Sequence, residues 1–170
     1  MSISTHPTSF TVEFEEEQKV IITNVRISSP QEPKLSAMVE AKAIWDTGAE
    51  ICVITERLAE QLGLPVISPI NIRGINHENS TELCLADIQL PNGMILQTVS
   101  IAKCEKLTPD DCSIIIGMSE IKKSDFCISY EKNRIVFSFR KPSRKRTDYV
   151  KAEKRRDLFQ PILTLWGKFR

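Results

Sequence analysis

Short apolar runs separated by polar turns follow one another along most of the chain, and this pattern predicts a protein built mainly of β-strands. Phe10, Val12 and Phe14 alternate with polar residues, as in a half-buried strand. Further strands are predicted over 19–27, 35–45, 70–75, 83–90, 94–102 and 114–116, with a last hairpin over 126–130 and 134–139.

One helix interrupts this pattern. Thr55 is a suitable N-cap, and Gly63 with Pro65 ends the helix. Its apolar face consists of Leu58, Ala59 and Leu62. Many short strands with one clear helix predict a mostly-β, closed, barrel-like fold.

Composition and charge divide the chain into a body and a tail. With 170 residues, 41% of them apolar, the chain is long enough for one domain with a substantial core. Residues 141–170 hold 10 Lys/Arg and 3 Asp/Glu, a charge of +7, whereas residues 1–140 hold 13 and 19, a charge of −6. We therefore expect an N-terminal segment (1–9), a folded domain (10–140) and a basic C-terminal extension (141–170).

The extension combines charge with apolar residues. Asp148 is placed to cap a helix over about 149–159, which Pro161 would limit, so the extension is expected to be partly helical. Its basic residues suit a solvated tail, nucleic-acid phosphates, an acidic partner or the acidic body of the protein itself. The apolar end over 158–166 favours docking on a surface. No RNA-binding motif is present, so nucleic acid is the less favoured partner.

Cysteine and histidine usage argues against a disulfide framework or a metal site. The five cysteines are an odd number and include no C-x-x-C, and the two histidines, His6 and His77, lie in polar surroundings. Residues 1–20 are acidic and lack the apolar core of a signal peptide, and no apolar run approaches the ~18–20 residues of a membrane helix. We expect a soluble, cytoplasmic protein with reduced, mostly buried thiols and no membrane contact.

The strongest chemical signal is Asp46-Thr47-Gly48-Ala49, which lies between the apolar runs 43–45 and 51–54. It puts one ionisable carboxylate on a tight glycine turn between two segments predicted to be buried strands. Burying a charge is costly unless partners compensate it, so this placement requires a functional reason.

A second element lies downstream at Ile115-Ile116-Gly117. Together the two elements resemble the retropepsins, the retroviral-type aspartic peptidases, and the resemblance spans roughly Phe10 to Arg140. It implies a closed acid-protease barrel in which the apolar-apolar-Gly element packs beneath the active turn and leads into a short helix. Ser119 departs from the family, in which Asp or Asn is frequent at this position, but Ser can still cap the helix.

The resemblance also implies a catalytic mechanism. Aspartic peptidases use two carboxylates that share one proton: the ionised one is the general base for a water, and the protonated one protonates the scissile amide. This chain has a single D-[ST]-G, so the second catalytic Asp must come from another copy. We therefore expect a homodimer in which Asp46 meets Asp46 of the partner.

The resemblance implies roles for the neighbouring residues. The Thr47 hydroxyl would bond across the two-fold axis, Gly48 would leave room for substrate backbone, and Ala49 and Glu50 would line adjoining subsites. Trp45 would pack against the body, and Gly117 would support the site. The segment 72–81, with Gly74 and Ile75, takes the place of the flap that closes over bound peptide, although an ordinary surface hairpin would show the same pattern. Residues Glu50, Gly74, Ile75 and Ile116 are the expected substrate contacts.

The sequence therefore predicts an aspartic endopeptidase that acts on peptides or unfolded proteins. It would need no metal and no organic cofactor, because the nucleophile is water. The alternative is a catalytically silent dimer of the same fold that binds peptide or nucleic acid. The presence of Asp46, Thr47, Gly48 and Gly117 together favours catalysis.

Overall fold

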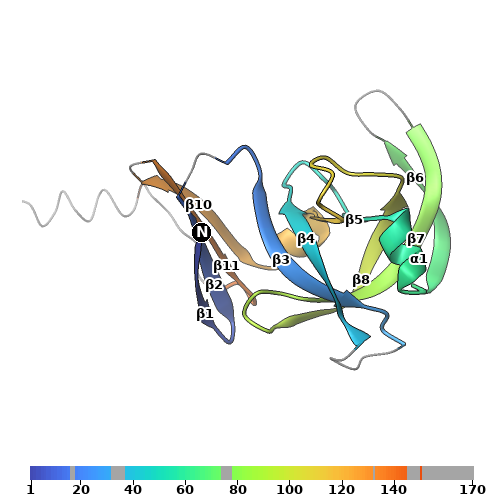
Figure 1. Cartoon of the computed structure of the whole chain (residues 1–170), viewed down its shortest axis with the longest axis horizontal. Coiled ribbons are helices and arrows are strands. Elements are labelled where there is room, and N and C mark those ends of the chain that lie inside the picture. Colours follow the sequence, from blue (N-terminus) through green and yellow to red (C-terminus); the bar gives the residue numbers. More distant parts are fainter. Residues whose placement is uncertain (16–17, 32–36, 74–77, 132, 145–149, 151–170) are drawn as a thin grey trace, which may run out of the picture.

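The computed structural model describes residues 1–15, 18–31, 37–73, 78–131, 133–144 and 150 (Figure 1). Its strands are β1 (Ser2–His6), β2 (Ser9–Phe14), β3 (Ile21–Ser28), β4 (Val39–Trp45), β5 (Cys52–Thr55), β6 (Val66–Arg73), β7 (Glu78–Gln89), β8 (Ile95–Cys104), β9 (Ile114–Ile116), β10 (Asp125–Glu131) and β11 (Arg134–Arg140). The two helices are α1 (Glu56–Gln61) and α2 (Met118–Ile121). No helix in these described ranges is long and apolar enough to cross a membrane.

Six strands form a closed barrel. They are ordered β3-β4-β9-β5-β8-β7, and β7 closes the ring by pairing with β3 at Ile27↔Ile88. The short strand β9 lies between β4, to which it is parallel, and β5, to which it is antiparallel. Its residues Ile114 and Ile116 are fully buried, whereas Ile115 between them is only partly buried. β6 pairs only with β7 and extends from the barrel.

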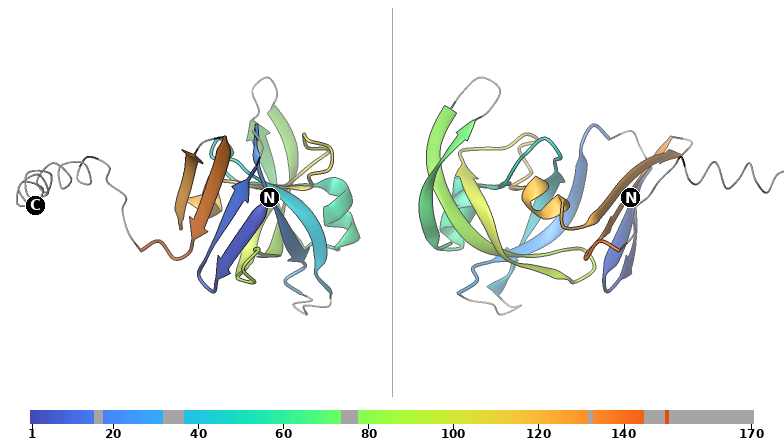
Figure 2. Two further views of the ribbon diagram at one scale, coloured as in Figure 1. Left: turned by 60° about the vertical axis from the view of Figure 1, so that its left-hand side comes forward. Right: turned by 180° about the vertical axis from the view of Figure 1, so that it is seen from behind.

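A second sheet stands beside the barrel, on the side away from α1 (Figures 1 and 2). Its four strands are antiparallel and ordered β1-β2-β11-β10. Phe10, Phe137 and Phe139 cover its inner face and pack on Trp45 at the end of β4, with ring centroids 6.0, 5.1 and 4.8 Å away. The indole Nε1 donates a hydrogen bond of 2.9 Å to Thr23 Oγ1, so the buried tryptophan has its polar atom paired. Trp45 therefore packs against the body as predicted.

The predicted fold class is confirmed: the chain is mostly β, with a closed barrel and a clear helix, α1, at the predicted place. Gly63 takes a positive φ of 56° directly after α1, as a helix-ending glycine does. Thr55 is the N-cap residue, although its hydroxyl makes no capping bond. Strand β1 was not predicted, because the polar sequence over 2–6 shows no alternation. The helix expected over 149–159 falls outside the described residues.

Candidate active site

The Asp46 turn connects β4 to β5 and lies at the surface of the chain. Asp46 is half-buried, while Thr47, Gly48 and Glu50 are exposed. The Gly48 N–H donates a hydrogen bond of 2.7 Å to Asp46 Oδ1, and the Ala49 N–H donates one of 3.4 Å to the Asp46 carbonyl oxygen. The first bond fixes the orientation of the carboxylate within the turn.

Backbone hydrogen bonds attach this turn to β9 and α2. The Asp46 N–H donates to the Ile116 carbonyl oxygen at 3.1 Å. In return, the N–H groups of Met118 and Ser119 donate to the carbonyl oxygens of Ala49 and Glu50 at 2.8 and 2.9 Å. The turn that carries the carboxylate is thus hydrogen-bonded to β9 at its start and to α2 at its end.

Gly117 makes this attachment sterically feasible. A Cβ at this position would lie 2.3 Å from the Ile51 carbonyl oxygen and 2.8 Å from that of Ala49. Both atoms belong to the backbone, so neither can move aside without displacing the turn. Only glycine allows α2 to begin this close to the turn.

The expected capping role of Ser119 is wrong. The N-cap of α2 is Gly117, and no side chain caps this helix. Ser119 lies inside α2, and its hydroxyl contacts the Cys52 Sγ at 3.5 Å. Cys52 is buried, and this burial raises the pKa of its thiol, so the thiol stays protonated as a small packing group.

A cavity of about 360 Å³ opens beside the turn. Asp46 and Thr47 form part of its lining, and most of the remainder is apolar. Its other lining residues are Gln18, Lys19, Val20, Ile21, Ile44, Trp45, Thr108, Ile115, Ile128, Tyr130 and Ile135. The carboxylate therefore borders a space lined by both apolar and polar groups.

The other predicted site residues occupy different positions. Ile116 is fully buried in the core, which does not fit the expected contact with substrate, and its neighbour Ile115 lines the cavity instead. Gly74 and Ile75 fall outside the described residues. The strands that lead to them, β6 and β7, pair antiparallel out to Arg73↔Glu78, as the two arms of a hairpin.

Sequence reasoning missed the side of the cavity that β10 and the start of β3 provide. Ile128 and Tyr130 alternate with polar residues in a strand that was itself predicted, so their common face could have been recognised. Their proximity to Asp46 could not have been, because it depends on how the two sheets pack. Among the described residues, no group of three or more His, Cys, Asp or Glu side chains could hold a metal ion.

Comparisons with known proteins agree with this geometry. The sequence model of the aspartyl protease family matches residues 36–119, a range that contains the Asp46 turn, β9 and Gly117. No curated protein matches the sequence.

Among solved structures, a retropepsin-like aspartic protease from Rickettsia conorii is similar in fold, with a TM-score of 0.50 and 16% identity, over 81% of this chain and 96% of that one. A second is the EIAV protease in complex with the inhibitor HBY-793, with a TM-score of 0.42 and 19% identity, over 62% of this chain and 88% of that one. A third is the retroviral protease-like domain of Ddi1 from Leishmania major, with a TM-score of 0.40 and 19% identity, over 70% of this chain and 95% of that one.

Three observations define the class of this protein: the family match, the closed barrel, and the Asp46 turn that is hydrogen-bonded to β9 and α2. The chain is a retropepsin-like, single-domain protein, and its residues 36–119 match the aspartyl protease family.

Proposed function

We propose that this protein is an aspartic endopeptidase that works as a homodimer, with Asp46 of each chain forming half of one catalytic site. The observation that carries the proposal is the Asp46 turn itself. One carboxylate lies at the surface, on a glycine turn held by backbone hydrogen bonds, and borders a cavity lined by both apolar and polar side chains. The chain has a single such turn, so one chain supplies only one of the two carboxylates that the chemistry needs.

In the proposed dimer the two carboxylates share one proton and hold a water between them. The ionised carboxylate takes a proton from the water, which attacks the scissile carbonyl carbon, and the protonated one then protonates the leaving nitrogen. The bond from the Gly48 N–H to Asp46 Oδ1 holds the carboxylate in place before substrate arrives. Water is the only co-reactant, so the proposed reaction needs no metal and no organic cofactor.

The neighbouring residues are proposed to bind an extended peptide. Thr47 would bond across the two-fold axis, and Gly48, Ala49 and Glu50 would contact substrate backbone and the adjoining subsites. Gly74 and Ile75 would belong to a flap carried by β6 and β7. The apolar side chains in the lining of the cavity, among them Ile44, Ile115 and Ile128, favour apolar substrate side chains next to the scissile bond.

The decisive experiment compares wild type with Asp46→Asn on an unfolded protein substrate. Asn has nearly the same shape but cannot act as a general base, so hydrolysis should fall at least about 100-fold. Asp110→Asn is the matched control, because Asp110 is an exposed carboxylate on another loop and does not itself line the cavity. Activity that survives Asp46→Asn, or is lost equally in Asp110→Asn, would refute the catalytic assignment.

A catalytically silent dimer that binds peptide is the second candidate. A statine-type inhibitor distinguishes these two candidates, because it stops hydrolysis in an enzyme and merely binds in a silent module.

The five free cysteines, three of them buried, suit a reducing compartment, so we propose the cytoplasm as the location.

A further inference from the structure

Helix α2 contains a buried carboxylate that the proposed catalytic reaction does not use. Glu120 is only 5% exposed. Its Oε1 lies 2.5 Å from the Lys123 Nζ, and its Oε2 lies 2.9 Å from the Lys141 Nζ. A charged side chain is tolerated in a buried position when its polar atoms are paired in this way. The two lysines therefore allow Glu120 to be buried where it is.

The two ion pairs of Glu120 connect different parts of the molecule. Lys123 lies just beyond the end of α2, so its pair with Glu120 is local. Lys141 directly follows β11 of the second sheet, and its N–H donates a hydrogen bond of 3.1 Å to the carbonyl oxygen of Thr8, between β1 and β2. The Glu120–Lys141 pair thus connects α2 to the second sheet. Seen from behind, α2 lies between this sheet and the barrel (Figure 2).

Helix α2 also holds the end of the Asp46 turn. The N–H groups of Met118 and Ser119 donate hydrogen bonds of 2.8 and 2.9 Å to the carbonyl oxygens of Ala49 and Glu50. The helix has four residues and no side-chain cap. A helix of this length is not stable by itself, so its position depends on its contacts with the rest of the chain.

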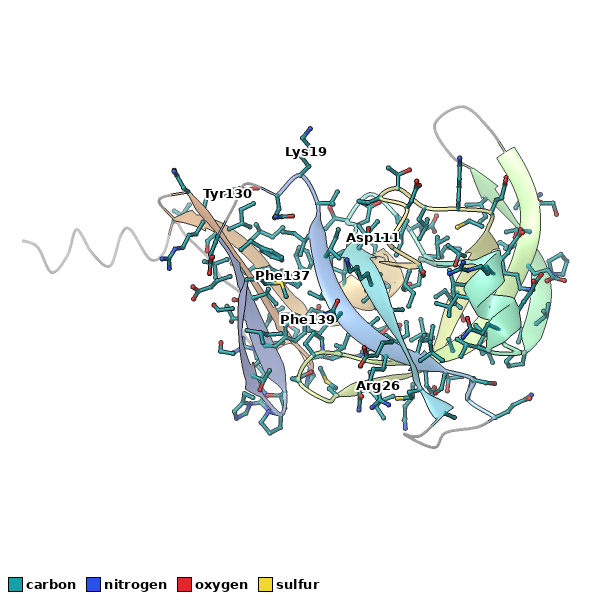
Figure 3. The ribbon with its side chains drawn as sticks, in the orientation of Figure 1. Lys19, Arg26, Asp111, Tyr130, Phe137 and Phe139 are labelled. Carbon is teal, nitrogen blue, oxygen red and sulfur yellow. The ribbon has the colours of Figure 1, made fainter. Side chains whose placement is uncertain are left out.

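The start of the same turn is held in another way. Figure 3 shows Phe137 and Phe139 between the second sheet and the barrel. Both rings pack on Trp45, which directly precedes Asp46. Apolar packing thus fixes the start of the turn on the second sheet, whereas the end of the turn reaches that sheet through α2 and Glu120.

We propose that Glu120 and Lys141 are positioning residues for the Asp46 turn. Their ion pair fixes α2 on the second sheet, and α2 fixes the end of the turn. This inference rests on the proposed function, because the position of the turn affects hydrolysis only if Asp46 is catalytic. A hydrogen-bonded ion pair with a buried partner has a defined geometry, whereas an exposed pair is easily replaced by water. A catalytic group displaced by about 1 Å can lose about 100-fold in rate, so a small movement of α2 is measurable.

The first measurement is amide hydrogen exchange in Lys141→Met, which removes the cation and keeps a long side chain. Exchange of the Met118 and Ser119 N–H groups should become at least about tenfold faster, because α2 separates more often from the turn. The Leu85 N–H on β7 is the internal reference, since it donates to the Pro65 carbonyl oxygen at 3.1 Å, away from α2. Its exchange should stay within about twofold of the wild-type value.

Two further variants serve as controls. Lys123→Met removes a cation from the same carboxylate but keeps the connection to the second sheet, so exchange should stay within about twofold of wild type. Lys141→Arg restores a cation and should return the exchange of Met118 and Ser119 to within about twofold of wild type. Every variant keeps the main-chain bond to Thr8, so the differences between them report the side chains.

The second measurement is steady-state hydrolysis, at protein concentrations far above the dimer dissociation constant of each variant. In Lys141→Met, kcat should fall at least about fivefold while KM stays within about twofold, because substrate still binds and the carboxylate is misplaced. Lys123→Met and Lys141→Arg should keep kcat within about twofold of wild type.

The outcomes separate the proposal from simple destabilisation and from the function itself. Faster exchange to the same degree at Met118, Ser119 and Leu85 would overturn the proposal, as would equal effects of Lys141→Met and Lys123→Met. Hydrolysis that requires Asp46 and is unchanged in Lys141→Met would refute the positioning role and leave the function standing. Selectively faster exchange in α2 of a protein whose wild type hydrolyses nothing would refute the function and leave the connection between Lys141 and the turn standing.

Discussion

At the scale of single residues, the site depends on Gly117 as much as on Asp46. Gly117→Ala would place a methyl group 2.3 Å from the backbone oxygen of Ile51, so the turn and α2 must separate. We expect it to destabilise the protein by about 2–3 kcal/mol and to reduce hydrolysis, because the carboxylate loses its fixed position. Ser119→Ala, two residues further along the same helix, removes only a weak contact with Cys52 and should cost less than about 1 kcal/mol. Thermal unfolding and hydrolysis rates of both variants test this, and equal effects would contradict it.

At the scale of elements, Asp125 ties the β10–β11 hairpin to the residues that follow it. Its carboxylate accepts hydrogen bonds from the Ser143 hydroxyl at 2.6 Å, the Arg144 N–H at 3.1 Å and the Arg140 Nε at 2.7 Å. The Ser143 hydroxyl, the Arg144 N–H and then the Arg140 guanidinium lower the pKa of Asp125 to about 2. Because the folded pKa is below the ordinary value of 3.8, the carboxylate stabilises the fold above that value.

This stabilisation should disappear as pH falls from 3.8 towards 2. The difference in Tm between wild type and Asp125→Asn is therefore expected to be largest at pH values well above 3.8 and to shrink through that window. Asp110→Asn, which alters an exposed carboxylate outside the hairpin, serves as the control. A difference for Asp125→Asn that does not change with pH would mean that the ionisation of Asp125 is not coupled to stability.

At the scale of the whole molecule, the basic extension leaves the body from a fixed point. The Lys141 Nζ lies 2.9 Å from an oxygen of the buried Glu120, which also pairs with Lys123, and the Lys141 N–H donates to the Thr8 carbonyl oxygen at 3.1 Å. With Ser143 and Arg144 held by Asp125, residues 141–144 belong with the body. The charges of +7 beyond residue 140 and −6 before it then favour docking of the extension on the body.

Truncation after Arg144 should therefore preserve the β-domain and change the salt dependence of activity. The attraction between body and extension weakens as added salt shortens the Debye length to about 8 Å near physiological ionic strength. A full-length chain with Leu163, Leu165 and Trp166 changed to Ser keeps the charge and loses the apolar end, so it separates the two contributions. Hydrolysis rates across a salt series provide the measurement. Identical salt responses of all three proteins would show that the extension does not dock on the body.

The sequence by itself determined the local features of this protein. Alternating and continuous apolar runs identified nearly all strands, and the helix α1 followed from its cap and glycine signals. The Asp46 turn and the Gly117 element were recognisable because their residue types are dictated locally, by a tight turn and a close backbone approach.

Only the tertiary structure decided which segments meet. Periodicity indicates that a residue is buried but not which distant strand covers it, so the closure of the barrel by β3 and β7 could not be predicted. The same reason explains why Ile115 lines the cavity while Ile116 is enclosed in the core. It also explains Tyr130: its position beside Asp46 depends on how the two sheets pack around Trp45, and no local pattern contains that packing.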